Sequence, residues 1–545
     1  MFTPGDGAIP FGSSWKYLVT STDQGAAWRP DGRQYTNAWV QERFWATAAT
    51  STDQLRKRVA FALHHIFMVS LADSNLWSHQ RAYAQYLDTL NRHAFGNYRN
   101  LLEDISLSPV MGIYLSHMRN RKEDPATGRV PDENFAREVM QLFSIGLHEL
   151  EPDGTLKLDA QGGAIETYNN DDVMALAKIF TGWSWAFPDN QLTESKFRWG
   201  WPDYQAANDT RIDLKNMRSY PGQFSTAAVT LFAGKPHAVN IPAGGSAESR
   251  LKLALDALHR HPNVGPFIGR QLIQRLVTSN PSPGYVYRCA EAFRDNGSGV
   301  RGDMKAVLRA ILLDYEARSL EAAGKQGFGK LKEPDLRLSS ILRSLGILAP
   351  SDGIYRIWNL ESVEWALDQN PLRSPTVFNF FSKDYSLPGA ISNAGLYSPE
   401  FQIANETTAI SGSNYLRWAI WDGVYNNQTD QSLYPAVDWQ GFADSITGGG
   451  GPALGTPAAD VAFVNRLSLL LTANAMSKDA DADHTNDMYT ILIDAAAGMR
   501  QTNPTVYWPP IDADCNTVTP GCAEIQHLKE LVWLVMTSPE GVVQR

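Results

Sequence analysis

Four carboxylates in one short part of the chain are the groups best suited to acid–base chemistry. Glu133 and Glu138 lie in one predicted helix, and Asp171 and Asp172 begin the next. Five positions separate the two glutamates, about 140° round a helix, so they cannot share one face closely. A proton donor and a base would therefore pair one glutamate with Asp171 or Asp172 across the two helices.

Two further residues of this segment, Arg137 and His148, would orient a substrate beside those carboxylates. The structural alternative is that Arg137 forms an ion pair with a carboxylate, while Asp171 and Asp172 cap their helix. The residue types alone leave both interpretations open.

Histidines offer a second chemistry. His64 and His65 lie in an apolar helical stripe, and with Glu138 and His148 they are candidate ligands for a transition metal inside a helical bundle. Bundle sites of this kind use repeated Glu-x-x-His pairs, and this chain has one such pair, on a distant helix. The alternative is that the histidines are structural.

Three aspartates, Asp479, Asp481 and Asp483, alternate as at the start of a calcium-binding loop. His484 and Thr490 stand where such a loop has its glycine and its final acid. The sequence therefore allows a structural Ca²⁺ or a solvated acidic loop.

Tryptophans flank an irregular stretch of the chain, at Trp183, Trp185, Trp199 and Trp201. Exposed indole faces near acids and amides would suit binding to sugar rings. The alternative is a satellite hydrophobic cluster beneath a long loop.

The cysteines bear on the compartment. Cys515 and Cys522 bracket a turn-rich segment short enough for a local disulfide, which would indicate an oxidising compartment. Two free thiols are the alternative. Cys289 lies alone in a helical run and is expected to be a buried apolar side chain.

The elements that must position these residues are mostly helices. Helical stripes recur through the first 345 residues, interrupted by a short hairpin over residues 150–167 and an irregular stretch over 184–243. Residues 346–545 have longer loops between helical runs. The prediction is a mainly α fold: one large multi-helical body, with a helical core over 1–345 and a loop-rich helical part over 346–545 packed on it.

Composition excludes several classes of protein. The 545 residues include 48 basic and 58 acidic side chains, a net charge of −10, so a nucleic-acid partner is not expected. No apolar run approaches the roughly 20 residues of a transmembrane helix. The common nucleotide-binding, α/β-hydrolase and zincin motifs are absent from the sequence.

Four stretches occur in order along the chain, at Asp132–Gly146, Asp172–Trp183, His261–Ile273 and Asn370–Phe381. Together they resemble a known bacterial family, named domain of unknown function 1800. The resemblance covers roughly residues 50–410. The chain departs from the family pattern at Asp132, at Gln141, and at His237, where the family's His-Asp…Lys element is reduced to His-Ala.

The resemblance implies a helical fold and a secreted or periplasmic bacterial protein, often encoded beside a sulfatase-like partner, with no agreed activity. The leading expectation is a hydrolase or lyase that acts on, or binds, an extracellular polysaccharide through these carboxylates. A metal-dependent His/Glu enzyme and a non-catalytic surface or assembly protein are the alternatives.

Overall fold

The chain forms two compact units. A computed structural model describes residues 37–200, 211–357, 367–424, 430–448, 450–453, 455–474, 476, 488–501 and 522–544. Within these ranges, the first unit is built mainly from residues 53–328 and 372–383. The second is built from residues 41–52, 329–371 and 384–545.

Helices dominate both units. They make up 52% of the residues that the structure describes, and the strands among those residues form only two-stranded antiparallel sheets, so the mainly α prediction is confirmed. No helix among the described residues has the length and apolar character needed to cross a membrane.

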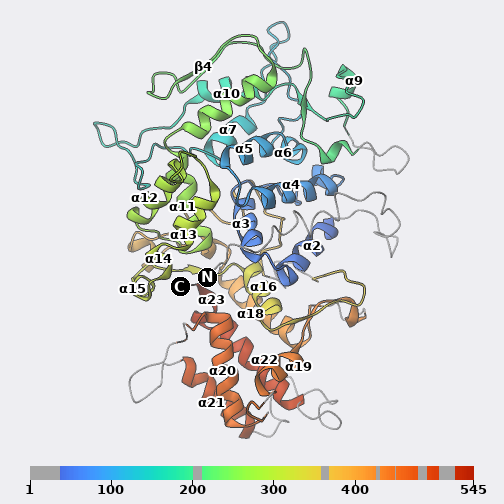
Figure 1. The fold of residues 1–545 in the computed structure, drawn as a ribbon, viewed down its shortest axis with the longest axis vertical. Helices are drawn as coiled ribbons and strands as arrows, with labels where there is room; N and C mark the ends of the chain where they lie inside the picture. Colours follow the sequence, from blue (N-terminus) through green and yellow to red (C-terminus); the bar gives the residue numbers. More distant parts are fainter. Residues whose placement is uncertain are drawn as a thin grey trace. The chain divides into compact units, whose positions relative to one another are not determined.

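The first unit contains helices of moderate length joined by long loops (Figure 1). In chain order these elements are α3 (Gln54–His64), η1 (Ser74–Leu76), α4 (Gln80–His93), α5 (Tyr98–Ser106), α6 (Pro109–Tyr114), α7 (Asn134–Gln141), α8 (Asn170–Ile179), α9 (Glu194–Phe197), η2 (Ile212–Leu214), α10 (Ala247–Arg260), α11 (Val264–Leu276), α12 (Pro283–Arg294), α13 (Met304–Leu312), α14 (Tyr315–Arg318) and α15 (Leu320–Ala323). α8 packs against both α7 and α10, and α10 packs against α5.

Two short antiparallel sheets belong to this unit. β1 (Trp183–Ser184) pairs with β2 (Arg218–Ser219), and β3 (Val229–Leu231) pairs with β4 (Val239–Ile241). The hairpin predicted over residues 150–167 is present as a series of antiparallel bridges, from His148–Glu166 to Leu158–Ala164.

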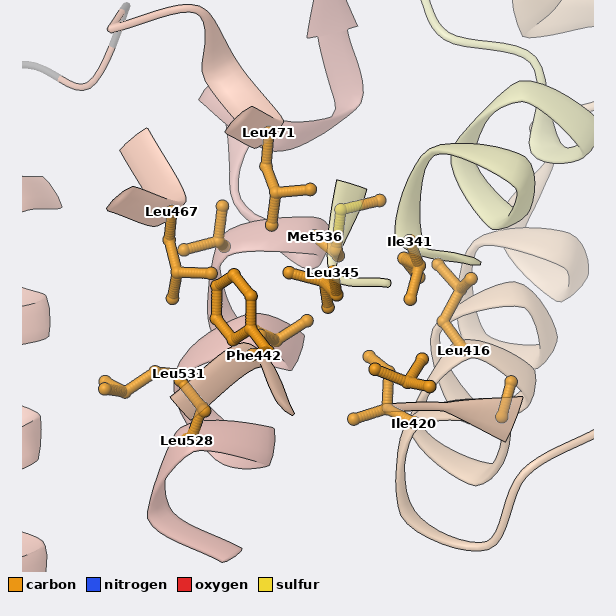
Figure 2. Close-up of a cluster of buried hydrophobic side chains, with 14 of the residues drawn as sticks. Ile341, Leu345, Leu416, Ile420, Phe442, Leu467, Leu471, Leu528, Leu531 and Met536 are labelled. Atoms are coloured by element: carbon orange, nitrogen blue, oxygen red, sulfur yellow. The ribbon is translucent and has the colours of Figure 1, made fainter. Parts of the chain in front are cut away.

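The second unit has its own hydrophobic core. Its elements are most of α2 (Asn37–Thr50), then α16 (Pro334–Ser344), α17 (Ala390–Asn393), η3 (Pro399–Gln402), α18 (Glu406–Trp421), η4 (Gln431–Leu433), α19 (Trp439–Thr447), α20 (Pro457–Thr472), α21 (Met488–Gln501), α22 (Cys522–Thr537) and α23 (Pro539–Val542). Figure 2 shows how side chains such as Leu416, Phe442, Leu467 and Leu531 converge from four of these helices.

Strand pairing in the second unit joins distant parts of the sequence. β5 (Lys330–Leu331) pairs with β8 (Val543–Gln544), and β6 (Ile347–Leu348) pairs with β7 (Ala436–Val437). Lys332 continues β5 and donates hydrogen bonds to the carbonyl oxygens of Leu471 and Gly541, at 2.8 and 3.0 Å. This unit therefore depends on residues near the end of the sequence.

Candidate functional site

Glu138 is a buried carboxyl group on α7 of the first unit. Its side chain is only 7% exposed, and its Oε2 atom is buried without a hydrogen-bond partner among the described residues. Burial raises the pKa of Glu138, and the nearby charge of Arg137 opposes that rise. A carboxyl group with a raised pKa holds a proton to higher pH than an exposed one, as a general acid must.

Tyr168 lies beside this carboxyl group. Its hydroxyl is 3.4 Å from Oε1 of Gln141, one turn further along α7 than Glu138. Burial raises the pKa of Tyr168 to about 12, and the charges of Glu138 and Glu166 add to the rise while Arg137 lowers it. These charges act on Tyr168 only because the four groups are close together.

Glu133 occupies a different environment from Glu138. Its carboxylate forms an ion pair with Arg137 at 3.4 Å, and both side chains are partly exposed. An exposed ion pair of this kind contributes little stability, about 0–1 kcal/mol. Glu138, by contrast, is buried and has one oxygen without a partner among the described residues.

A second charged cluster adjoins the first at Glu166. Nζ of Lys235, on the loop between β3 and β4, is 2.6 Å from Oε1 of Glu149 and also donates to the backbone carbonyl of Glu166. Lys157 approaches the other carboxylate oxygen of Glu149 at 3.9 Å. Because Glu166 is two residues before Tyr168, the chain segment 166–168 joins the two clusters.

Two histidine rings complete the second cluster. The ring centroids of His237 and His261 are 4.1 Å apart with the planes at 78°, and Nε2 of each ring is buried without a partner among the described residues. Burial lowers the pKa of His261 to about 3 and lowers that of His237. Both rings are therefore neutral at pH 7.

The tautomer of His261 follows from its backbone contact. The amide of Asn263 donates to Nδ1 of His261 at 3.1 Å, so Nδ1 carries the lone pair and Nε2 carries the proton. A protonated Nε2 donates a hydrogen bond and cannot ligate a metal ion. The ring therefore offers a donor to this cluster.

Asp172 holds the second cluster in place. Its Oδ2 accepts from the amide of Asn169 at 3.0 Å, closing a capping box at the start of α8, and its Oδ1 accepts from the amide of Phe232 at 2.5 Å. Phe232 precedes Lys235 and has a left-handed backbone, with φ of 59°. Both oxygens of Asp172 thus bind backbone amides, whereas its neighbour Asp171 is exposed.

The helices α7 and α8 run antiparallel, which explains this arrangement. Gln141 at the end of α7 meets Tyr168, just before α8. At the opposite end, the rings of Phe135 and Phe180 meet edge to face with centroids 4.6 Å apart. The charged clusters therefore lie at one end of the helix pair.

The tryptophans lie toward the other end, and two of them are in the core. Trp183 and Trp185 are 2% and 0% exposed, and their indole Nε1 atoms donate to the carbonyl oxygens of Ile179 and Trp199. Trp199 is 50% exposed. Trp201 lies outside the described residues, so Trp199 is the one predicted platform residue that the structure places at the surface.

The predicted metal ligands do not come together. Nε2 of His64 contacts the hydroxyl of Tyr83 at 2.8 Å, and His65 lies among aromatic rings, with Phe61 at 4.3 Å. His148 is exposed on the hairpin. Over the part of the chain that the structure describes, no three His, Cys, Asp or Glu side chains are arranged to hold a metal ion.

Other predicted sites cannot be placed. The aspartates of the possible calcium loop, Asp479, Asp481 and Asp483, lie outside the described residues. So do Cys515 and the side chain of Cys522, the predicted disulfide pair. Cys289 is described, and it is a buried free thiol as expected.

Sequence reasoning did not identify Lys235 and Tyr168 as site residues. Lys235 stands two residues before His237, the remnant of the family's His-Asp…Lys element, and this proximity was the available signal. Tyr168 immediately precedes the cap residue Asn169, and nothing in its spacing distinguishes it from a core aromatic.

Fold and site together define a mainly helical protein with a charged cluster at one end of a helix pair. The chain belongs to the family described as protein of unknown function (DUF1800), which matches residues 13–541. The predicted family is thereby confirmed, over a longer span than the signature stretches. No curated protein and no solved structure matches the chain.

Proposed function

We propose that this protein is an exported acid–base enzyme, a hydrolase or lyase that acts on an extracellular polysaccharide. The observation that carries the proposal is Glu138, a buried carboxyl group with a raised pKa and one unpartnered oxygen. Perturbed carboxyl groups of this kind are frequent at catalytic sites.

Glu138 is the proton donor in this proposal. In hydrolysis, its proton passes to the leaving oxygen as the glycosidic C–O bond breaks, and water adds to the sugar carbon. The proton of that water passes to a carboxylate base. Asp171 is assigned this role because it is exposed at the start of α8, whereas both oxygens of Asp172 are held by backbone amides.

The surface beyond the helix pair supports a polymeric substrate. Trp77 and Trp199 are 54% and 50% exposed, so about half of each side chain is open to solvent. Exposed apolar surface of this kind often marks a binding site. They lie near Trp185, since Trp199 accepts its indole hydrogen bond and His79, two residues after Trp77, has its ring 5.6 Å from that of Trp185.

The decisive variant is Glu138→Gln, assayed for new reducing ends and unsaturated sugars on a panel of polysaccharides. General acid catalysis is worth about 10²–10⁴-fold, so turnover should fall by at least about 100-fold. Glu133→Gln is the matched control on the same helix, and it should keep turnover within a few-fold because Glu133 is in a surface ion pair.

The pH profile gives a second readout. Wild-type turnover should decline as pH rises through the raised pKa of Glu138, because only the protonated acid can donate. Full turnover by a folded Glu138→Gln protein would refute this role. Loss of folding in that variant, judged by circular dichroism, would show that the carboxyl group is structural.

A further inference from the structure

Arg119 presents a cationic side chain that has no anionic partner. It is exposed, and among the described residues no carboxylate or carbonyl oxygen lies within hydrogen-bonding distance of its guanidinium. Nearby arginines differ, since Arg121 is paired with Glu194 and Arg129 with Asp124. Partial burial lowers the pKa of Arg119, so the guanidinium has lost water without gaining a counter-charge.

The backbone fixes the place of this side chain. Arg119 has a left-handed conformation, with φ of 64°, which is unfavourable for any residue with a Cβ atom. Its amide donates to the carbonyl oxygen of Trp183 at 2.7 Å, and the next carbonyl, that of Asn120, accepts from Gly182 at 2.8 Å. These bonds hold Arg119 in position although its guanidinium binds nothing there.

The two exposed indoles belong to the segments that surround Arg119. A Cβ atom on Gly200, next to Trp199, would lie 3.7 Å from Nη1 of Arg119. Burial lowers the pKa of His79, two residues after Trp77, to about 4, and the charge of Arg119 contributes to that shift. The guanidinium therefore lies close to both of the segments that carry Trp77 and Trp199.

We propose that Arg119 binds an anionic substituent, a carboxylate or a sulfate ester, of a polysaccharide whose sugar rings contact Trp77 and Trp199. This inference rests on the proposed function and names its substrate class. A guanidinium makes two parallel hydrogen bonds to a carboxylate or sulfate, and indole faces suit sugar rings. In a chain with a net charge of −10, such a polymer needs a local cation to bind.

Calorimetric titration of the intact protein tests the inference. The probes are two matched pairs: polygalacturonate against its methyl ester, and dextran sulfate against dextran. We expect one acidic polymer to bind at least about tenfold more tightly than its neutral counterpart. The pair that shows this difference identifies the substituent as carboxylate or sulfate.

Arg119→Gln should lose about this tenfold preference. The control is Arg294→Gln, which removes the same charge from an exposed arginine that is paired with Glu291 at 2.6 Å, and binding should not change. Trp199→Ala should weaken binding of the acidic and neutral polymers alike, because the indole contacts the sugar ring.

If Arg119→Gln and Arg294→Gln weakened binding of the acidic polymer equally, the inference would be overturned, because the loss of one positive charge anywhere on the surface would then explain the weaker binding. The inference would also be overturned if neither acidic polymer bound better than its neutral counterpart. Arg119-dependent binding without any turnover would contradict the proposed enzyme and leave the anion site standing. Turnover of a neutral glycan, unaffected by Arg119→Gln, would contradict the anion site alone.

Discussion

At the scale of single residues, Asp335 is the most unusual carboxyl group of the second unit. It is 1% exposed, and neither of its oxygens has a hydrogen-bond partner among the described residues. Burial, with the charge of Glu333 adding to it, raises the pKa of Asp335 well above its usual range. The folded protein therefore keeps a proton on Asp335 that the unfolded chain releases.

The sign of the pH dependence follows from this proton. Between the unfolded pKa near 4 and the folded pKa, the folded state binds more protons, so stability contributed by this site falls as pH rises. The asparagine of Asp335→Asn cannot ionise, so we expect the stability of this variant not to show that fall as pH rises. Its thermal midpoint relative to wild type should rise by a few degrees between pH 4 and pH 8.

Asp352→Asn is the control of opposite sign. Burial alone would raise the pKa of Asp352, but the hydrogen bonds and charge of Arg356 lower it overall. Asp352→Asn should therefore lower the free energy of unfolding at neutral pH but leave it unchanged at low pH. Identical pH dependence in Asp335→Asn and wild type would contradict the assignment.

Residue types could be predicted at this scale, but partners could not. Glu138 and Asp172 are both acids in predicted helices, and the sequence ranks them equally as catalytic candidates. The structure separates them, because Asp172 binds the amide of Phe232, a residue 60 positions away. A contact over that separation depends on the packing of α8 against β3, which no local pattern encodes.

At the scale of elements, Asp172 on α8 accepts a hydrogen bond from the amide of Phe232, at the end of β3, and so links α8 to the β3–β4 hairpin. Asp172→Ala removes the Asp172 half of the capping box and a buried hydrogen bond, each worth about 0.5–1.5 kcal/mol. We expect the first unit to lose about 1–3 kcal/mol of stability and amide exchange to accelerate in residues 229–241.

Asp171→Ala is the matched control for that prediction, since Asp171 is the exposed neighbour on the same helix turn. It should change stability by no more than about 1 kcal/mol and leave exchange in the hairpin unchanged. If amide exchange in the hairpin were equally slow in both variants, contacts other than the Asp172 hydrogen bond would hold the hairpin against α8.

Helices were easier to predict than their ends. The stripe over residues 54–69 predicts a helix of that length, but α3 stops at His64. The hydroxyls of Tyr83 and Tyr86 on α4 donate to the carbonyl oxygens of Val69 and Phe67, and so hold the chain outside a helix. Tertiary hydrogen bonds thus end a segment whose apolar pattern continues.

At the scale of the whole molecule, each unit has a separate core, and a cavity in one should affect that unit first. Leu272 on α11 and Leu467 on α20 are both 0% exposed, one in each unit. Leu-to-Ala changes in cores typically cost 2–5 kcal/mol. We expect Leu272→Ala and Leu467→Ala to lower different transitions in differential scanning calorimetry, each serving as the control for the other.

A single transition, lowered equally by both variants, would show that the two cores unfold together. The sequence predicts a division at residue 345, whereas contacts assign residues 329–345 to the second unit and 372–383 to the first. Composition marks where loops become longer. It does not reveal which unit a returning segment joins.

The pairing of β5 with β8 sets an order of events during synthesis. β5 leaves the ribosome roughly 200 residues before its partner strand, which at 5–20 residues per second is a delay of about 10–40 s. During that interval α16 and then α18 are synthesised, and the core that their apolar faces share with α20 and α22 stays incomplete until those later helices follow. A nascent chain of this kind would be a client for chaperones until its last strand emerges.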